Sequence, residues 1–593
     1  MSSLCFANRS RPVLAAAGAR ALRASVELLE QRTLLSASSV DLSFSGDGRN
    51  ELFIADGARF TAVTVLPGGK VLAAGSVDLL PGLGFQQDFL VARFNANGSI
   101  DTTFGGGDGW VNTNFYPFSS SGQSQDLAAA IVQLPGGKFA VAGRTHDGFS
   151  TRGSNMAIAR YHANGSPDLS FSRDGKAIVD FGDDSRDEAT ALVVTPSHKL
   201  LLIGVAENFI EGGTYADLAI AKYGTDGNLD TWFGGGTGKV TRDVGTVFGP
   251  DPASGNDDLF ADQQASSAAL LPNGQVVIAG AIRSSAQSQT PLNDGFVASF
   301  HSNGSLDTSF NGGKGFVQTN TAPGAAEEAY TSIAVLRDGK ILAGGRTQPV
   351  ESEPFEQNFL LARFNANGPL DTSFGAGGFA GADFTAHGPA GDQVRSLIVQ
   401  PTGRILAVGS SSPSDVEQPT RTALARYTAG GLPDTSFSRD GKQLSNIIPS
   451  GGAAAGTATP DRKTVIVSAL PIAVVARFGA DDAATASISG TFYNDLNGNG
   501  VRNSGEGPLA GWLAYVDSNN DGFFTPGEKS ATSGAPGVYQ ITGLVPGTYR
   551  VREVRMNGWI RTQPAGVYPL GYYDVTVGLG GAIPGRHFGN RLA

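Results

Sequence analysis

Apolar residues in this chain gather into short runs separated by glycine-rich turns, as in residues 89–94 (FLVARF). Two such runs, residues 130–134 and 138–143, enclose a Pro-Gly-Gly turn. Glycine takes a positive φ in a tight turn at low cost, so this arrangement favours a β-hairpin. None of these runs has the 3.6-residue period of an amphipathic helix. The pattern therefore predicts an all-β protein built from short strands.

A motif of Asp, any residue, a small or aromatic residue and Phe, followed by glycine-rich sequence, recurs seven times. Its aspartates are Asp41, Asp101, Asp168, Asp230, Asp307, Asp371 and Asp434, spaced by 60, 67, 62, 77, 64 and 63 residues. Each repeat is expected to hold four strands: one directly after the motif Phe, a hairpin pair, and one ending in a basic residue. Radial repetition of four-stranded units is typical of β-propellers. We therefore predict a seven-bladed β-propeller over residues 39–479, with an open β-solenoid as the alternative.

The repeats resemble the delta-60 repeat family of bacterial β-propellers. The resemblance rests on the recurring Asp-x-Ser-Phe motif, on glycine-lysine turns such as Gly69-Lys70, and on strands such as residues 359–364 (FLLARF). It extends over about residues 40–479. The resemblance implies a propeller fold, and it brings no established activity with it.

A basic residue at the end of the last strand of a repeat precedes the next motif Asp by eight residues. The pairs are Arg93 and Asp101, Arg160 and Asp168, Lys222 and Asp230, Arg363 and Asp371, and Arg426 and Asp434, whereas Ser299 interrupts the pattern before Asp307. Arginine and a carboxylate pair with defined geometry, so we expect each pair to link one blade to its successor. Asp41 lacks an upstream arginine and Arg477 lacks a downstream aspartate, so these two should be neighbours in a closed ring. The alternative is a solvated arginine beside an aspartate that caps a turn.

The repeat pattern stops after Arg477, and residues 480–487 form a short linker to a second domain, residues 488–593. Two loops in that domain have the ligand spacing of a calcium loop, with glycine at the sixth position. The first loop offers Asp495, Asn497, Asn499, Val501, Asn503 and Glu506, and the second offers Asp517, Asn519, Asp521, Phe523, Thr525 and Glu528. Calcium takes six to eight oxygen ligands, which carboxylates, amides and one backbone carbonyl supply at this spacing. The sequence therefore predicts two Ca²⁺ sites, with metal-free polar turns as the alternative.

Strand-like segments, residues 488–492 and 514–516, lead into these loops, so the pair differs from a helix–loop–helix unit. The domain resembles the SdrD B-like (Cna B-type) β-sandwich, a prealbumin-like fold, through residues 494–500 (NDLNGNG) and 539–553 (YQITGLVPGTYRVRE). The resemblance implies a calcium-stiffened stalk or spacer. Some members of that family carry a Lys–Asn isopeptide bond, which we do not expect here. Lys529 is the only lysine after Lys463, and it lies outside the first strand.

Residues 1–38 differ from the rest of the chain, because an Ala- and Leu-rich stretch is interrupted by Arg20 and Arg23. Such a stretch is a weak secretory signal. Residues 26–37 (VELLEQRTLLSA) resemble the LEPR-type amino-terminal segment of large bacterial surface proteins. The resemblance implies export, and an amphipathic helix is the alternative. The chain has no apolar run of 18 residues that would cross a membrane.

The net charge of −11 argues against a nucleic-acid partner, which requires a basic face. The six histidines form no metal or catalytic motif, and no G-x-S-x-G sequence is present. Residues 234–240 (GGGTGKV) lack the Ser or Thr of a phosphate-binding loop. We therefore expect a non-enzymatic, secreted or cell-surface protein of binding, structural or adhesion type, with calcium as its cofactor and an extracellular polymer or protein as its partner. The alternative is a secreted polysaccharide hydrolase or lyase with its active site in the propeller channel.

Overall fold

The computed structural model describes residues 40–54, 57–79, 86–117, 124–148, 153–182, 185–210, 213–244, 262–283, 293–319, 327–348, 356–384, 390–414, 418–438, 440–449, 451–468, 473–479, 486–518, 521–525, 528–544, 547–564, 571–577 and 582–593. The chain divides into two compact units, Met1–Gly479 and Ala480–Ala593. The export-like segment, residues 1–38, lies outside the described residues.

The first unit consists of seven four-stranded antiparallel sheets. Sheet 1 is β2 (Arg59–Val65), β3 (Val71–Val77), β4 (Asp88–Phe94), β5 (Trp110–Thr113); sheet 2 is β6 (Gln125–Gln133), β7 (Phe139–His146), β8 (Asn155–Tyr161), β9 (Lys176–Val179); sheet 3 is β10 (Arg186–Val194), β11 (Leu200–Ile210), β12 (Gly213–Tyr223), β13 (Lys239–Arg242); sheet 4 is β14 (Asp262–Leu270), β15 (Val276–Arg283), β16 (Asn293–Phe300), β17 (Phe316–Thr319). Sheet 5 is β18 (Glu327–Val335), β19 (Ile341–Gln348), β20 (Asn358–Phe364), β21 (Phe379–Ala382); sheet 6 is β22 (Ala390–Val399), β23 (Ile405–Pro413), β24 (Arg421–Tyr427), β25 (Lys442–Ser445); sheet 7 is β26 (Ala453–Ala458), β27 (Thr464–Ser468), β28 (Ala473–Phe478), β1 (Arg49–Leu52). The described residues contain no α-helix, only short 3-10 turns at Gly105–Gly107, Pro135–Gly137 and Gly234–Gly236, so the prediction of an all-β fold built from four-stranded units is confirmed.

The two central strands of a sheet are buried on both faces. Every residue of β3 and β4 is buried, because side chains of a neighbouring sheet cover each face. Seven hydrophobic clusters lie between successive sheets, including one that joins sheet 7 to sheet 1. The first strands of the sheets contact one another in the cycle β2, β6, β10, β14, β18, β22, β26 and back to β2. The hydrophobic core of this unit is therefore distributed over seven junctions between sheets.

The last strand of each of sheets 1 to 6 follows the next motif along the chain. β5 comes after the motif of Asp101 but pairs with β4 of the sheet before it, with Leu90 opposite Asn112. Glycines at positive φ, such as Gly105 (64°) and Gly109 (81°), reverse the chain between these two strands. The strand after the motif Phe therefore closes the preceding sheet and does not join the hairpin that follows it in the same repeat.

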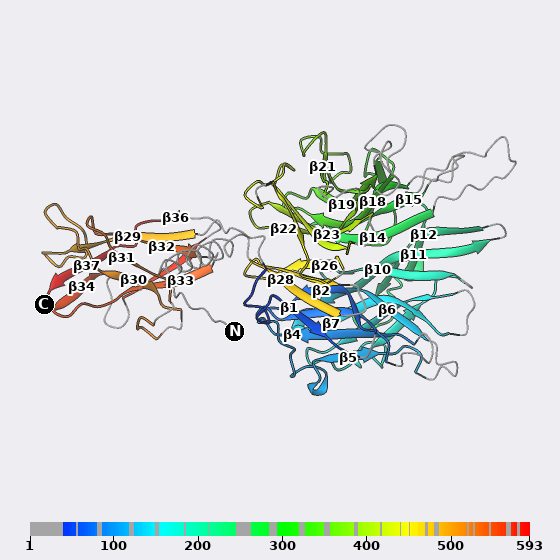
Figure 1. Ribbon diagram of the computed structural model, residues 1–593, viewed down its shortest axis with the longest axis horizontal. Helices are drawn as coiled ribbons and strands as arrows, with labels where there is room; N and C mark the ends of the chain where they lie inside the picture. The colour runs from blue at the N-terminus through cyan, green and yellow to red at the C-terminus, as the bar shows by residue number, and fades with distance from the viewer. Residues whose placement is uncertain are drawn as a thin grey trace, which may run out of the picture. The chain divides into compact units, whose positions relative to one another are not determined.

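Sheet 7 is assembled from both ends of the unit. β1 pairs with β28 along four residues, from Arg49 opposite Ala476 to Leu52 opposite Ala473. Figure 1 shows this junction as blue β1 beside yellow β28. The chain thus needs both ends of the unit to complete its last sheet.

The second unit contains two sheets with one shared core. A five-stranded sheet has the order β32 (Val538–Leu544), β29 (Ala486–Asn494), β37 (Phe588–Leu592), β34 (Trp559–Gln563), and β36 (Ala582–Ile583) also pairs with β29. A four-stranded sheet has the order β31 (Ser530–Thr532), β30 (Leu513–Val516), β33 (Gly547–Glu553), β35 (Tyr573–Val577). One hydrophobic cluster includes Phe492 and Tyr539 from the first sheet and Val516 and Val551 from the second.

No helix in the described part of the chain is long and apolar enough to cross a membrane.

Candidate functional site

The motif aspartates lie in a repeated network of hydrogen bonds and charges. In sheet 1, Arg93 Nε and Lys70 Nζ both donate to Asp101 Oδ2 at 2.6 Å, and Thr103 Oγ1 donates to Oδ1 at 2.7 Å. The Arg93 guanidinium also lies 4.7 Å from the centre of the Phe104 ring. Burial favours the neutral acid, but the bonds from Lys70 and Thr103 and the charge of Arg93 outweigh it, so the pKa of Asp101 is lowered. The carboxylate therefore stays ionised.

The same arrangement recurs around the ring with small changes. The other aspartates and their two cations are Asp168 with Arg160 and Lys138, Asp230 with Lys222 and Lys199, Asp371 with Arg363 and Lys340, Asp434 with Arg426 and Arg404, and Asp41 with Arg477 and Lys463. In sheet 4, neutral residues stand at both cation positions: Ser299 and Gln275 donate to Asp307 Oδ2 at 3.4 and 2.7 Å. The sequence predicted only the basic residue of the strand as a partner of each aspartate, and it did not predict the second cation, which comes from the glycine-lysine turn. The recurrence of a basic residue in that turn is the signal that would have revealed this second partner.

The link between successive sheets uses a different bond from the one expected. Arg93 lies on β4 and Asp101 precedes β5, so this pair belongs to one sheet. The contact with sheet 2 is made by Arg93 Nη1, which donates to the carbonyl oxygen of Ala163. Equivalent bonds to a backbone carbonyl oxygen of the next sheet are those from Arg160 to Thr225, from Lys222 to Ser302, from Arg363 to Ala429, and from Arg477 to Ala96. The prediction that the Arg–Asp pair itself joins two blades is wrong, because the strand after each motif closes the sheet of its own arginine.

The two ends of the ring meet at one of these networks. Arg477 Nε donates to Asp41 Oδ2 at 2.6 Å, across a separation of 436 residues in sequence. The Asp41 amide donates to the Arg477 carbonyl oxygen at 2.9 Å. The structure therefore places Asp41 and Arg477 side by side, as a closed ring requires.

A second row of acidic and amide side chains lies at the start of the inner strands. Asp126 on β6 accepts a bond from the backbone N–H of Phe115 in the preceding sheet at 2.8 Å, and Asp187 and Asp392 accept equivalent bonds at 2.7 and 2.9 Å. Gln263 Oε1 accepts the equivalent bond in sheet 4, from the backbone N–H of Val244 at 3.0 Å. Burial raises the pKa of Asp126 to about 7 and the pKa values of Asp187 and Asp392 to about 6. This row was not predicted from the sequence, where it shows only as an acidic or amide residue near the start of the first strand of a sheet. In the structure each of these residues lies two positions before a β-bulge.

The first calcium-type loop brings buried acidic side chains together. Asp495 is fully buried, and its carboxylate accepts bonds from the backbone N–H groups of Asn499 at 3.1 Å and Gly500 at 2.7 Å. Glu506 is 7% exposed, and its Oε2 accepts a bond from the Asn503 N–H at 2.6 Å. Glu506 Oε1 is buried without a hydrogen-bond partner. Gly500 has a φ of 73°, which the sharp turn at this position requires.

The remaining oxygen donors of the first loop lie near its surface. The side-chain amides of Asn497 and Asn499 both donate to Asn503 Oδ1 at 2.9 Å. Val501 is 59% exposed, as expected for a position that would contribute only its backbone carbonyl. The loop thus joins a buried acidic base to an exposed amide rim.

The second loop differs because a cation from the protein enters it. Asp517 is 3% exposed, and its Oδ2 accepts a bond from Arg552 Nε at 2.5 Å. Asp517 Oδ1 is buried without a partner. Glu528 accepts bonds from the N–H groups of Ser518 and Thr525, both at 2.9 Å.

The rest of the second loop contributes less to the buried site. Asp521 accepts a bond from the backbone N–H of Phe523, whose side chain is 66% exposed, and Asn519 lies outside the described residues. Within the described ranges, no group of three or more His, Cys, Asp or Glu side chains is arranged to hold a metal. Each loop would therefore have to rely on amide and carbonyl oxygens beside its carboxylates.

Two histidines lie close to motif aspartates. His162 Nε2 is 3.6 Å from Asp168 Oδ1, and His301 Nε2 is 3.5 Å from Asp307 Oδ1. The neighbouring serine, Ser170, donates to Asp168 rather than to His162. A nucleophilic serine requires the histidine as its base, so this set has the wrong order of contacts for a catalytic triad.

Comparison with known proteins supports the propeller assignment. Residues 67–104, 137–171, 336–374 and 400–437 match a family described as a domain of unknown function (DUF5122) β-propeller. These matches support a β-propeller family. Each of the four stretches ends on a motif phenylalanine: Phe104, Phe171, Phe374 and Phe437. No functionally curated protein matches the chain.

Several solved structures are similar in outline. A polysaccharide lyase described as a PL25 ulvan lyase is 10% identical, with 73% of this chain and 96% of that chain covered and a TM-score of 0.44. The GH93 α-L-arabinofuranosidase of Fusarium graminearum is 11% identical, with coverages of 64% and 97% and a TM-score of 0.38. The minor pilin GBS52 of Streptococcus agalactiae is 15% identical, with coverages of 30% and 69% and a TM-score of 0.14. None of the three is similar enough to transfer an activity.

Proposed function

We propose that the first unit is a seven-bladed β-propeller acting as a non-enzymatic binding platform. The second unit would be a calcium-stiffened β-sandwich of the SdrD B-like type that serves as its spacer. The observation that carries this proposal is the use of the repeated polar residues. All seven motif aspartates accept bonds from cations or amides of their own sheet, and these bonds stabilise the loop that leads into the last strand of that sheet. A rigid closed ring with its recurrent chemistry engaged in structure suits binding better than turnover.

The closed ring supports the propeller assignment over an open solenoid. The cycle of contacts among the seven inner strands returns from β26 to β2. An open solenoid would leave its first and last units without a common junction. Pairing of β1 with β28 also covers the edge that β28 would otherwise expose, and exposed edges invite aggregation.

Buried acids with raised pKa values are the described feature that would suit the alternative enzyme function. Asp126, Asp187 and Asp392 titrate near neutral pH, as general acids and bases do. Each of them, however, accepts a hydrogen bond from a backbone N–H of the preceding sheet. These bonds favour a structural role, because a catalytic base needs its oxygen directed at substrate.

The residues of the first loop fit a calcium ion. A buried oxygen without a partner costs free energy, and Glu506 Oε1 is such an atom in the first loop. Neither Asp495 nor Glu506 forms an ion pair with any residue in the described part of the chain. Asp495, Asn497, Asn499, Asn503 and Glu506 would hold the ion with their side chains, and Val501 with its carbonyl oxygen. Bound calcium would neutralise the buried carboxylates and hold the loop rigid.

Export to the cell surface or the medium completes the proposal. Its support is the resemblance of residues 26–37 to an amino-terminal segment of bacterial surface proteins. Fractionation of cells that express the full chain tests this location, and recovery in the cytosolic fraction alone would contradict it.

Two experiments test the remaining proposals. The full-length protein is applied to an array of extracellular glycans and proteins, and every ligand that binds is also assayed for new reducing ends and for unsaturated products. Binding without turnover is expected, whereas turnover would support the hydrolase or lyase alternative. Thermal unfolding with calcium and with EDTA tests the spacer, where an unchanged melting temperature would refute the calcium assignment.

A further inference from the structure

The inner strand of sheet 6 carries a large basic side chain at its β-bulge. Each of the seven inner strands has one extra residue where its pairing with the second strand of the sheet shifts. In six sheets this residue is small, and these residues are Thr61, Ala129, Thr190, Ser266, Thr331 and Ala454. In sheet 6 it is Arg395. Bulges re-aim a side chain and are common beside functional sites, so Arg395 is a candidate for a role in binding.

Arg395 reaches solvent from the middle of an inner strand. Its side chain is exposed, although β22 contacts the inner strands of both neighbouring sheets. Sheet 5 holds the backbone on either side of it. Thr331 Oγ1 donates to the Val394 carbonyl oxygen, and the Leu397 N–H donates to Ser332 Oγ at 3.1 Å. Since the inner strands surround the axis of the ring, the solvent that reaches Arg395 is that of the central channel.

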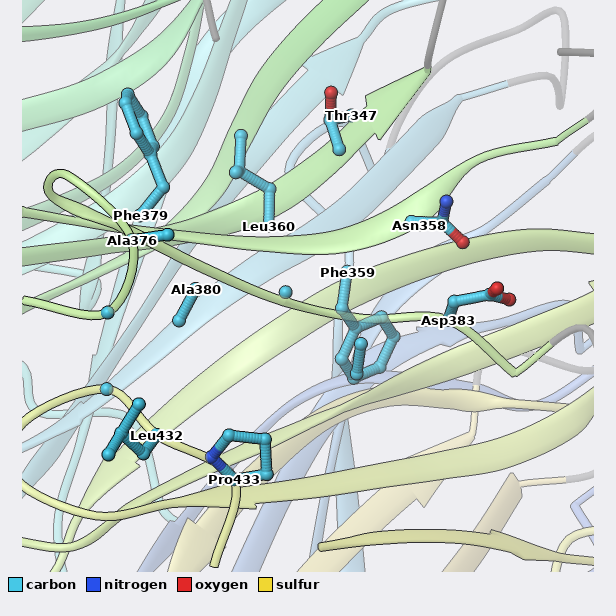
Figure 2. A pocket seen from close by; sticks show the side chains of 14 residues that line it. Thr347, Asn358, Phe359, Leu360, Ala376, Phe379, Ala380, Asp383, Leu432 and Pro433 are labelled. Atoms are coloured by element: carbon cyan, nitrogen blue, oxygen red, sulfur yellow. The ribbon is translucent and has the colours of Figure 1, made fainter. Parts of the chain in front are cut away.

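A second arginine, Arg346 on β19 of sheet 5, faces the same strand. Arg346 lies opposite Phe359 in the register of sheet 5, and Phe359 packs against residues of sheet 6 in one hydrophobic cluster. Phe359 also lines the groove shown in Figure 2. Gly344 lies so close to the Leu397 side chain that a Cβ at Gly344 would approach it to 2.9 Å. Residues two apart in a strand share a face, so Arg346 lies beside Arg395 as Gly344 lies beside Leu397.

The two guanidinium groups repel each other. Burial by the surrounding strands, and then the charge of Arg346, lower the pKa of Arg395. Neither arginine has a hydrogen bond, an ion pair or an aromatic ring as its partner among the residues that the structure describes. Arginine is protonated at neutral pH. Two positive charges therefore lie side by side here with no described carboxylate to balance them.

The junction between sheets 2 and 3 shows what differs. Arg144 has the place in sheet 2 that Arg346 has in sheet 5, and its Nη1 lies 3.4 Å from Glu188 Oε2 of sheet 3. The residue of sheet 6 that corresponds to Glu188 is Gln393, since each follows the buried acid of its inner strand. Sheet 6 thus has an amide instead of the carboxylate, and it has Arg395 where sheet 3 has threonine. Both changes make this junction more positive.

We propose that Arg346 and Arg395 bind an oxyanion group of the ligand, a carboxylate or a sulfate ester, at the centre of the ring between sheets 5 and 6. A guanidinium donates two parallel hydrogen bonds to such a group, and an anion between the two cations replaces their repulsion by attraction. One pair of arginines fits a single oxyanion rather than a row of phosphates, in agreement with the net charge of −11. The inference rests on the proposed binding function, and it assigns to that function a ligand chemistry and a place.

The test restores a carboxylate within the protein. Gln393→Glu gives Arg346 a partner like Glu188, and Arg395→Thr restores the residue that sheets 1, 3 and 5 have at this bulge. Arg144→Gln is the matched control, because it removes an arginine from the same place in a junction that has its own carboxylate. Calorimetry on the full-length protein measures the binding of uncharged maltotriose and of three anionic probes: trigalacturonate, sulfated maltotriose and triaspartate. The three anionic probes distinguish a saccharide carboxylate, a sulfate ester and a peptide carboxylate as the source of the oxyanion.

We expect at least one anionic probe to bind and maltotriose not to bind. Arg395→Thr and Gln393→Glu should each weaken the binding of that probe by about tenfold or more, whereas Arg144→Gln should change it by less than about twofold. Thermal unfolding confirms that each variant is folded.

Three results would overturn the oxyanion site: failure of every anionic probe to bind, equal binding of maltotriose, or binding that neither Arg395→Thr nor Gln393→Glu weakens. A ligand from the extracellular array that binds equally to the wild type and to both variants would also overturn this site, but it would leave the binding function standing. An array without any ligand would instead count against the binding function itself.

Discussion

Replacing Asp41 by asparagine should weaken the closure of the ring more than it weakens any one sheet. The Asp41 carboxylate accepts bonds from Arg477 Nε at 2.6 Å and Ser43 Oγ at 2.6 Å, and Lys463 Nζ lies 2.9 Å from it. The Arg477 side chain is only 6% exposed. A neutral asparagine would leave this buried guanidinium without its counter-charge.

The magnitude of the effect follows from the acidity of Asp41. Burial raises its pKa, but the bonds from Ser43 and Lys463 and the charge of Arg477 lower it from 3.8 to about 2. At about 1.36 kcal/mol per pKa unit, this difference corresponds to about 2 kcal/mol of stabilisation. Because the folded-state pKa is the lower one, the stabilisation is complete above about pH 4 and is lost as the pH falls through about 2. Measurements at pH 7 should therefore show the whole loss.

Asp371→Asn is the matched control, since Asp371 also binds an arginine and a lysine. Its arginine, Arg363, is eight residues away, whereas Arg477 is 436 residues from Asp41. Both variants should lose about 2 kcal/mol in denaturant unfolding. Only Asp41→Asn should also release β1, which is held to β28 along four residues.

Hydrogen exchange of the β28 amides measures this release. About 2 kcal/mol corresponds to roughly a 30-fold rise in the opening equilibrium, so exchange in β28 should accelerate by about that factor in Asp41→Asn and stay near the wild-type rate in Asp371→Asn. Equal acceleration of β28 in both variants, or none in either, would refute the reasoning that this pair closes the ring.

Three further predictions concern the buried acids, the calcium loops and sheet 4. Burial raises the pKa of Asp126 to about 7, so the stability of the wild type should fall as the pH rises from about 4 to 7; Asp126→Asn should flatten that fall in unfolding free energy, and an unchanged pH profile would contradict the assignment. Glu506→Gln should reduce the calcium stoichiometry measured by calorimetry. Arg552→Gln should raise the calcium affinity of the second loop, because it removes a cation that competes for Asp517, and weaker calcium binding in this variant would count against the interpretation. Ser299→Arg should supply the missing partner of Asp307 and raise the unfolding free energy by about 1 kcal/mol, and a lower melting temperature would show that the site cannot take the larger side chain.

Local sequence patterns determined much of this protein. Short apolar runs, glycine-rich turns and the recurring aspartate predicted four-stranded units and their number. The eight-residue spacing predicted that Arg93 lies near Asp101. The segment between them is short enough to bring the two side chains together, and this does not depend on how the strands are divided among the sheets. The same spacing predicted the meeting of Asp41 and Arg477, which depends only on the ring being closed.

Tertiary structure decided the features that depend on neighbouring sheets. The acceptors of the arginine Nη1 groups and the backbone N–H bound by Asp126 both involve two sheets. Even the assignment of β5 to sheet 1 required the chain reversal after Phe104. A sequence pattern records which residues are apolar and how far apart they lie along the chain. Which surfaces then pack together is set by the mutual burial of whole sheets, and no single repeat carries that information.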